Sequence, residues 1–363
     1  MNAVAPIMVM AGGTGGHVFP ALAVAACLRD SGQPVVWMGT RAGIEARLVP
    51  QAGIPIEWLR IQGLRGKGLL ARLQAPFKLV VACWQALLIL RRHRPRAVLG
   101  LGGFASGPGG LMAWLLRIPL IVHEQNAVIG LTNRLLSRLA RISYFAFPQA
   151  ARGLARAQVV GNPVRAGILS IPAPQQRLGA REASASLQVL VVGGSLGARS
   201  LNRVVPRALA LLEPGDRPRV WHQCGPKHLD ECRAAYRQHE VAAEVVDFID
   251  DMPAAYAWAD LVICRAGALT VAELAAAGVA SILVPYPHAV DDHQFHNAGW
   301  LADADAALRV RDDELDTDWL AGRLRHFRDH RQQLLDMASR ARALAFTDAA
   351  RQVADGVLQE ARA

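Results

Sequence analysis

The stretch MVMAGGTGGHVFPALAV, residues 8–24, decides the fold of the first half of the chain. Its apolar beginning is typical of a buried strand, its glycines predict a turn, and its end has the apolar spacing of a helix. The same order returns in VLVVGGSLGARSLNRVV, residues 189–205. Because a strand, a glycine turn and a helix open a Rossmann-like domain, the repetition predicts two such domains.

Further apolar runs alternate with amphipathic segments along the whole chain. Runs that stay apolar without alternation predict parallel strands buried on both faces, with helices on either side of the sheet. The predicted strands cover residues 6–11, 35–39, 97–101, 119–124, 189–194, 245–249, 260–267 and 280–286, and the region 312–362 is predicted to be helical. The fold class is therefore α/β, with two Rossmann-like doubly wound parallel sheets.

The length of 363 residues exceeds what one hydrophobic core usually supports. Between residues 161 and 187 the periodicity fails and Pro, Gly, Ala and Ser dominate, as is typical of a connection between domains. We therefore predict an N-terminal domain over 1–163, a C-terminal domain over 164–340 and a C-terminal helix over 341–363. We expect this helix to pack back on the N-terminal domain.

The composition narrows the class of protein. A net charge of +10 favours an anionic partner, which could be nucleic acid, a phosphorylated metabolite or an acidic membrane surface. The arginines are dispersed and only 6% of residues are aromatic, which argues against nucleic acid. The five cysteines form no C-x-x-C pair, which excludes a disulfide scaffold or zinc ribbon and favours a reducing cytoplasm. We expect neither a signal peptide nor a membrane-spanning helix.

The chain has three glycine-rich turns, and we expect two of them to hold phosphate groups. The turn at 12–16 precedes a helix, so its amides and the helix N-terminus favour an anion; a turn that holds nothing is the alternative. The turn at 193–199, which also precedes a predicted helix, is expected to bind a diphosphate in the same way. The segment 100–105 matches G-x-G-x-x-G/A, but the prolines and glycines that follow delay its helix, so we do not expect a dinucleotide there.

Two further polar segments have competing interpretations. Glu273 lies in the first turns of a predicted helix, where it could accept hydrogen bonds from a ribose diol or only favour the helix dipole. Asp291, Asp292 and His293 look like metal ligands, but the carboxylates are adjacent and no second His follows at i+4. We therefore expect no metal, and a ligand contact at the carboxyl edge of the sheet instead.

The segment FKLVVACWQALLIL, residues 77–90, is too short to span a bilayer but more apolar than an ordinary surface helix. Its ends are basic and it contains aromatic residues, so we expect contact with anionic lipid, with packing against the sheet as the alternative. The residues in question are Phe77, Lys78, Trp84, Arg91 and Arg92, with Arg65, Lys67 and Arg72 upstream.

Eight motifs follow one another from end to end of the chain: GGTGGHVFP, LGLGGFASGPGG, HEQNAVIGLTN, GNPVR, VVGGSLGARSLN, FIDDM, CRAGALTVAEL and DDHQFHNA. In this order they resemble the MurG family, UDP-N-acetylglucosamine (UDP-GlcNAc) transferases that make lipid II for peptidoglycan. The resemblance implies a GT-B fold, with the donor on the C-terminal domain and lipid I, the undecaprenyl-diphosphate-linked acceptor, on the N-terminal domain. It also implies a peripheral position on the cytoplasmic face of the inner membrane, no cofactor and cell-wall synthesis proteins as partners.

The resemblance also assigns roles to residues. It places Thr14, Gly15 and Gly16 at the donor sugar or diphosphate, Asn126 at the sugar, and Arg165 and Ser195 near the phosphates. The backbone of Ile249 would meet uracil, Gln294 would hold sugar hydroxyls, and Glu273 would bind ribose within the helix start Ala268, Leu269, Thr270, Val271 and Ala272. The family usually has Pro where this chain has Ile129, which could loosen the loop beside Asn126.

Forming a β-1,4 bond from an α-linked donor inverts C1, so a single displacement suffices. The acceptor hydroxyl needs a general base, and an imidazole titrates in the right range. His17 is our candidate, with a contact to phosphate as its alternative and His123 and Glu124 as other candidates. We expect helix N-termini at 196 and 268 to stabilise the leaving UDP without metal. Competing functions are a UDP-GlcNAc 2-epimerase or other GT-B enzyme, a dehydrogenase and a nucleic-acid binder.

Overall fold

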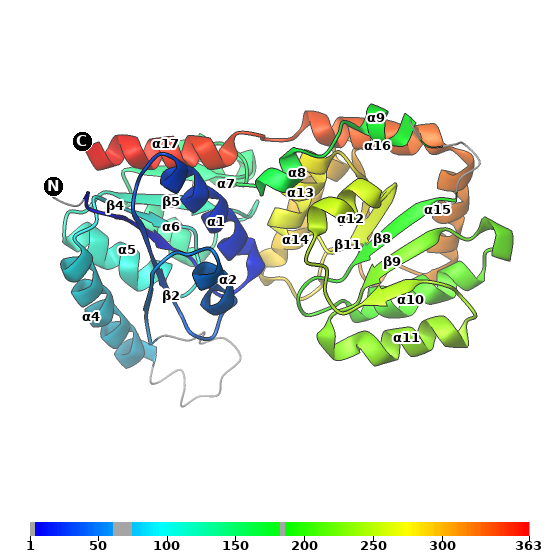
Figure 1. The fold of residues 1–363 in the computed structure, drawn as a ribbon, viewed down its shortest axis with the longest axis horizontal. Helices are drawn as coiled ribbons and strands as arrows, with labels where there is room; N and C mark the ends of the chain where they lie inside the picture. Colours follow the sequence, from blue (N-terminus) through cyan, green and yellow to red (C-terminus); the bar gives the residue numbers. More distant parts are fainter. Residues whose placement is uncertain (1–3, 61–74, 180, 182–185, 363) are drawn as a thin grey trace. The chain divides into compact units, whose positions relative to one another are not determined.

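The protein divides into two compact units, shown by a computed structural model that describes residues 4–60, 75–179, 181 and 186–362 (Figure 1). The first unit comprises Met1–Arg165 and Asp348–Ala363, and the second comprises Ala166–Thr347. The C-terminal segment thus belongs with the N-terminal half of the chain. Its helix α17 packs against α1 and β4.

A seven-stranded sheet of parallel strands forms the centre of the first unit, in the order β3-β2-β1-β4-β5-β6-β7. Its elements are β1 (Ile7–Met10), α1 (Gly15–Asp30), β2 (Val35–Gly39), α2 (Glu45–Gln51), β3 (Ile56–Trp58), α4 (Ala75–His93), β4 (Ala97–Gly100), α5 (Ser106–Leu115), β5 (Leu120–Glu124), α6 (Leu131–Ser137), β6 (Ile142–Phe145), α7 (Pro148–Ala151), β7 (Ala157–Val159) and α17 (Ala349–Arg362).

The apolar strand β1 explains why this sheet is covered on both faces. Successive side chains of a strand point to opposite faces. Ile7 and Val9 pack in one core with α1 and α17, while Met8 and Met10 pack in another with α4 and α5. All four side chains are buried, so both helical layers are needed. The sequence-based prediction of a parallel sheet between helices is confirmed for this unit.

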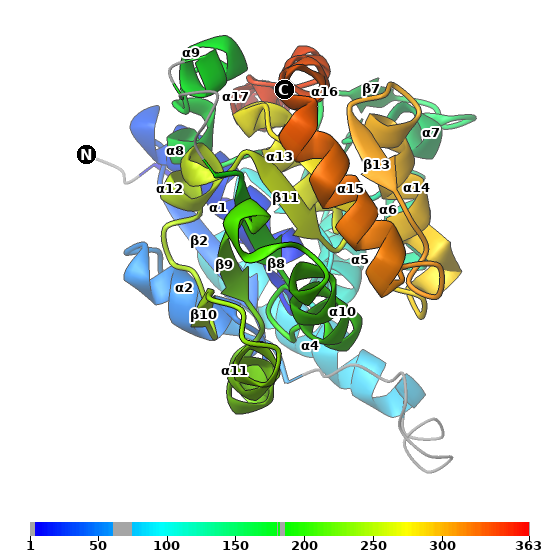
Figure 2. The ribbon, with the colours of Figure 1, turned by 90° about the vertical axis from the view of Figure 1, so that its right-hand side faces the viewer.

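The second unit contains a six-stranded parallel sheet in the order β10-β9-β8-β11-β12-β13. Its helices and strands are α8 (Ala166–Leu169), α9 (Pro174–Gly179), β8 (Gln188–Val192), α10 (Arg199–Ala210), β9 (Arg219–Gln223), α11 (Leu229–Gln238), β10 (Glu244–Val246), α12 (Met252–Trp258), β11 (Leu261–Cys264), α13 (Ala268–Ala277), β12 (Ala280–Leu283), α14 (His293–Ala302), β13 (Ala307–Arg309), α15 (Thr317–Asp329) and α16 (Arg331–Ala343), with 3-10 turns at 214–216, 226–228 and 290–292. Helices α10 and α15 lie side by side on one face of the sheet (Figure 2).

In both sheets the strand order reverses beside the first strand. The reversal lies between β1 and β4 in the first unit and between β8 and β11 in the second. In doubly wound folds ligands bind outside the carboxyl ends of the strands at such a reversal. The glycine turns after β1 and β8 therefore lie where the topology favours a binding site.

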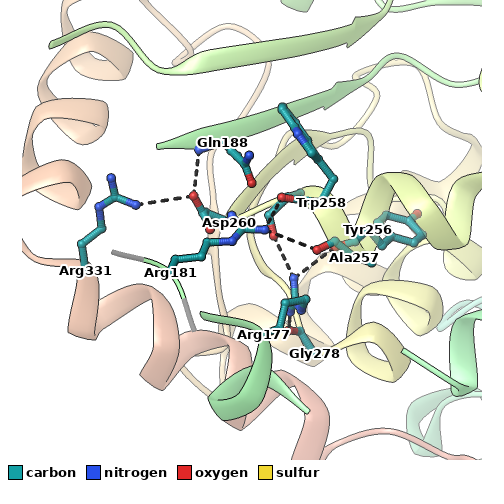
Figure 3. Close-up of polar contacts among 10 residues, drawn as sticks. Arg177, Arg181, Gln188, Tyr256, Ala257, Trp258, Asp260, Gly278 and Arg331 are labelled. Atoms are coloured by element: carbon teal, nitrogen blue, oxygen red, sulfur yellow. Dashed lines mark hydrogen bonds and ion pairs between the residues drawn. The ribbon is translucent and has the colours of Figure 1, made fainter. Parts of the chain in front are cut away.

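A cluster of arginines anchors the start of the second unit to its sheet (Figure 3). Asp260 has only 2% of its surface exposed and accepts hydrogen bonds from Arg181, from Arg331 and from the backbone N–H of Gln188. Arg177 donates to the carbonyl oxygens of Tyr256, Ala259 and Gly278. Arg177 and Arg181, which precede β8 in the chain, are thereby fixed to the ends of α12 and α13.

Among the described residues, no helix is both long and apolar enough to cross a bilayer. Residues Arg65, Lys67 and Arg72, which were predicted to flank the lipid-contacting helix, lie outside the described part of the chain.

Candidate functional site

The first half of the candidate site is the glycine turn between β1 and α1. Helix α1 begins at Gly15, and Thr14 has an extended backbone at its N-cap. A buried carboxylate from α2 holds the turn: Glu45 accepts from the N–H of Gly13 at 2.9 Å and from both the N–H and the hydroxyl of Thr40, at 3.0 and 2.7 Å. Glu45 was not predicted, although it fixes the backbone of the first glycine turn.

His17 lies in the first turn of α1, and its ring belongs to a chain of hydrogen bonds. Its Nδ1 is 2.8 Å from Oε1 of Gln125, which follows β5. The amide nitrogen of Gln125 is 3.1 Å from Nδ1 of His123, and Nε2 of His123 is 2.9 Å from the carbonyl oxygen of Gly161. The structure therefore brings together two of the predicted residues, His17 and His123, through a glutamine that was not predicted.

Two glycines allow the turn after β4, residues 100–105, to approach the glycine turn after β1. A Cβ on Gly102, where φ is +103°, would lie 2.9 Å from the His17 ring, and a Cβ on Gly103 would overlap the carbonyl oxygen of Gly12. Helix α5 begins only at Ser106. This segment, which resembles a dinucleotide fingerprint, thus packs against the first glycine turn.

Glu124 organises the loop that carries Asn126. Its carboxylate is almost fully buried and accepts from the N–H groups of Asn126 and Gly130, at 2.9 and 3.1 Å, and from the amide of Asn133 at 2.9 Å. Both sides of Ile129 are therefore tied to one carboxylate.

Burial lowers the pKa of His123 to about 4, so this imidazole is neutral near neutral pH.

Arg165 also lies in the first unit, near the N-terminal end of α1. The centre of its guanidinium group is 4.8 Å from the centroid of the Phe19 ring, in a cation–π contact. Phe19 is two residues beyond His17, so the GNPVR motif and the first glycine turn share one region of this unit.

In the second unit, the turn between β8 and α10 presents Ser195 as an exposed residue. The turn is held by Gln223 of β9, whose Oε1 accepts from the N–H of Gly194 at 3.0 Å and whose amide donates to the carbonyls of Gly194 and Asp247. Helix α10 begins at Arg199, three residues after the predicted 196, because Gly197 still has a positive φ of 76°. Gln223 was not predicted.

Glu273 projects from α13, the helix that begins directly after β11. The side chains of Ala268, Leu269 and Val271 are buried, so this helix start would meet a ligand through its backbone N–H groups. Glu273 is 4% exposed, and the Tyr256 hydroxyl donates to its Oε2 at 3.2 Å. Tyr256 is a further residue that the sequence did not reveal.

Two other predicted residues, Gln294 and Ile249, lie in the first turn of α14 and in a loop. Gln294, at the start of α14, accepts a hydrogen bond from the N–H of Tyr286 at 2.9 Å. Asp291 and Asp292 before it both have positive φ, 52° and 48°. Ile249 is buried in the loop after β10. Among the described residues, no three or more His, Cys, Asp or Glu side chains are grouped so that they could hold a metal ion.

Comparisons with known proteins identify the family of the chain. Residues 7–144 match the N-terminal domain of glycosyltransferase family 28, and residues 188–353 match its C-terminal domain. A protein of Alkalilimnicola ehrlichii called UDP-N-acetylglucosamine–N-acetylmuramyl-(pentapeptide) pyrophosphoryl-undecaprenol N-acetylglucosamine transferase is 57% identical, over 98% of this chain and 99% of its own.

Solved structures give the same result. The crystal structure of Acinetobacter baumannii MurG is 42% identical and covers 98% of this chain and 100% of its own, with a TM-score of 0.83, which confirms the predicted GT-B fold. The Neisseria meningitidis UDP-GlcNAc 2-epimerase covers 97% and 99% with a TM-score of 0.68, but at 12% identity it shares only the fold. The chain therefore belongs to glycosyltransferase family 28, and within it to the MurG family.

Proposed function

We propose that this protein transfers GlcNAc from UDP-GlcNAc to O4 of the MurNAc sugar on lipid I and so produces lipid II. The observation that carries the proposal is the 57% identity to a transferase of that name over nearly the full length of both chains. The relationship to the 2-epimerase is one of fold alone and gives that activity no support.

The second unit has the groups that a UDP-sugar requires. The start of α13 has backbone N–H groups for a diphosphate, and the turn that Gln223 holds carries the exposed Ser195. Glu273 is buried and held by Tyr256, which suits recognition of the two ribose hydroxyls. In this proposal uracil meets the backbone of Ile249 and the sugar hydroxyls meet Gln294.

The first unit supplies the proton acceptor. His17 removes the proton from the acceptor hydroxyl as that oxygen attacks C1 of the donor, and UDP leaves from the opposite face of the sugar. Thr14, Gly15 and Gly16 would contact the donor sugar or diphosphate through the turn that Glu45 fixes. Asn126 and Arg165 would contact the sugar and phosphates.

The exposed side of α4 fits contact with a membrane that carries the lipid acceptor. Phe77, Val80, Trp84 and Leu88 recur at helical spacing, and 73% of Phe77 and 60% of Trp84 are exposed. Helix α5, in contact with α4, adds exposed Trp114 and Leu115. Lys78, Arg91 and Arg92 are also exposed, so an apolar surface with basic residues is available to anionic lipid. We propose a peripheral position on the inner membrane on this basis.

Release of UDP in the presence and absence of acceptor tests the transferase proposal. The protein is incubated with UDP-GlcNAc alone and with a lipid-diphosphate-linked MurNAc-peptide. UDP is expected only with the acceptor, together with one GlcNAc in β linkage on the lipid. Formation of UDP or of an epimerised sugar without acceptor would contradict the proposal.

A further inference from the structure

The chain of hydrogen bonds behind His17 determines which nitrogen of that ring carries a proton. The argument begins at His123, which is fully buried. Its Nε2 is 2.9 Å from the carbonyl oxygen of Gly161, and a carbonyl oxygen only accepts hydrogen bonds. The Nε2 of His123 is therefore protonated. Because burial keeps this imidazole neutral, its Nδ1 has a lone pair and accepts.

Gln125 has only one orientation that satisfies its surroundings. One side of its amide is 3.1 Å from Nδ1 of His123 and 3.0 Å from the carbonyl oxygen of the same residue. Both are acceptors, so the NH₂ group must lie on this side. The backbone carbonyl alone would require this orientation, whatever the tautomer of His123. Oε1 of Gln125 consequently points to Nδ1 of His17, 2.8 Å away.

An amide oxygen can only accept, so Nδ1 of His17 must donate. In the neutral ring the second nitrogen, Nε2, then carries the lone pair. We propose that Gln125 and His123 are positioning residues that hold neutral His17 with its proton on Nδ1, so that Nε2 is the atom that takes the proton of the acceptor hydroxyl. This inference rests on the role of His17 proposed above.

This chain of hydrogen bonds, from His17 through Gln125 and His123, determines the tautomer of His17 without placing a charged group beside its ring. Gln125 has an uncharged side-chain amide and only 1% of its surface exposed, and the Asn162 amide donates to the backbone carbonyl oxygen of Gln125 at 3.1 Å. The acidic groups nearby have other partners: Glu45 holds Gly13 and Thr40, and Glu124 holds the Asn126 loop. The acidic residue of a Ser-His-Asp triad orients its histidine in the same way, whereas here an amide and a second imidazole do so.

NMR of the full-length protein labelled with ¹⁵N-histidine tests the inference, because protonated and unprotonated ring nitrogens have distinct shifts. The signals of His17 are assigned by their loss in His17→Gln. At a pH where the ring is neutral, wild type is expected to show a protonated Nδ1 and an unprotonated Nε2. Gln125→Leu removes the acceptor, so the Nε2-protonated form should increase and kcat should fall about tenfold, with KM for UDP-GlcNAc within about twofold.

Two other variants separate positioning from packing. Gln125→Glu keeps an oxygen opposite Nδ1 of His17, and its other oxygen, which faces Nδ1 and the carbonyl oxygen of His123, must carry a proton to replace the NH₂ group. In this neutral form the variant should retain the wild-type tautomer and more of kcat than Gln125→Leu. Ser143→Ala removes a buried hydroxyl from the neighbouring strand β6 and should change neither quantity. If Gln125→Leu does not fold, wild type and Gln125→Glu still decide the question.

A protonated Nε2 in wild type would overturn the inference, as would a loss of kcat in Gln125→Leu without a change of tautomer. Failure of the proposed role of His17 is a separate result: His17→Gln would then keep its kcat while the wild-type tautomer remained as expected. The two claims are thus tested independently.

Discussion

Substitution of Gly102 by Ala provides a direct test of whether the position of the His17 ring matters. The added Cβ would lie 2.9 Å from the ring, whereas ordinary contact begins at 3.4 Å, so the two groups must separate by about 0.5 Å. The ring can move more easily than the backbone. We therefore expect the ring to shift and its 2.8 Å hydrogen bond to Gln125 to be disturbed.

The substitution has two effects of different size. Ala at a φ of +103° is strained by about 1–3 kcal/mol, which lowers the free energy of unfolding. A displacement near 1 Å costs an active site about 10²-fold in rate, so a shift of half that size should lower kcat on the order of tenfold. Gly153 gives a matched control, because its φ is +73° and a Cβ there would have no atom within 4 Å.

The assay combines urea unfolding with acceptor-dependent release of UDP. Gly102→Ala and Gly153→Ala should lose similar stability, but only Gly102→Ala should lose kcat. Equal kcat in both variants would refute the reasoning, because His17 would then tolerate displacement.

Three further predictions concern the second unit. Asp260→Ala leaves Arg181 and Arg331 without their buried partner and should lower the free energy of unfolding by about 3 kcal/mol. Urea titration measures this loss, with substitution of an exposed aspartate, Asp318→Ala, as the control. Tyr256→Phe should raise KM for UDP-GlcNAc about 2–10-fold but leave KM for its 2′-deoxyuridine analogue nearly unchanged. An equal rise of KM for both donors would contradict the proposal that Tyr256 acts by holding Glu273 against the ribose hydroxyls. His222 is buried in contact with Tyr236, Asn202 and Cys232, and this burial lowers its pKa to about 3, below its value in the unfolded chain. Between pH 6.5 and 3 the unfolded chain therefore binds a proton that the folded chain does not. The free energy of unfolding consequently falls as the pH drops from 6.5 towards 3. His222 should lower the free energy of unfolding by about 1.4 kcal/mol for each unit of pH in this range. In urea titrations, the free energy of unfolding of His222→Gln should therefore depend less steeply on pH than that of wild type.

The sequence predicted the centre of each sheet well, because central strands such as β1, β4, β8 and β11 are continuous apolar runs. It missed strands β3, β6, β7, β9 and β13, which lie towards the edges of the sheets. Strand β9, RVWHQ, mixes charged and polar residues with apolar ones, and β3 has only three residues. Their pairing comes from neighbouring strands rather than from their own pattern.

The candidate site was predicted where backbone and ligand-facing residues share one motif, as in the glycine turns. The residues that hold those motifs were missed because they come from distant segments. Glu45 is 32 residues from Gly13, and Gln223 is 29 residues from Gly194. A buried carboxylate or amide has no local sequence signal, since its role depends on a partner that only the folded sheet brings near. Gln125 stood within a recognised motif, yet its function became visible only through its contacts with His17 and His123.

A crystal structure of the protein soaked with UDP-GlcNAc tests the central claim most directly. Electron density for uridine is expected in the second unit, with the ribose hydroxyls within hydrogen-bond distance of Glu273 and the diphosphate at the Ser195 turn and the start of α13. Uridine bound away from both Glu273 and Ser195 would contradict the assignment of the donor site.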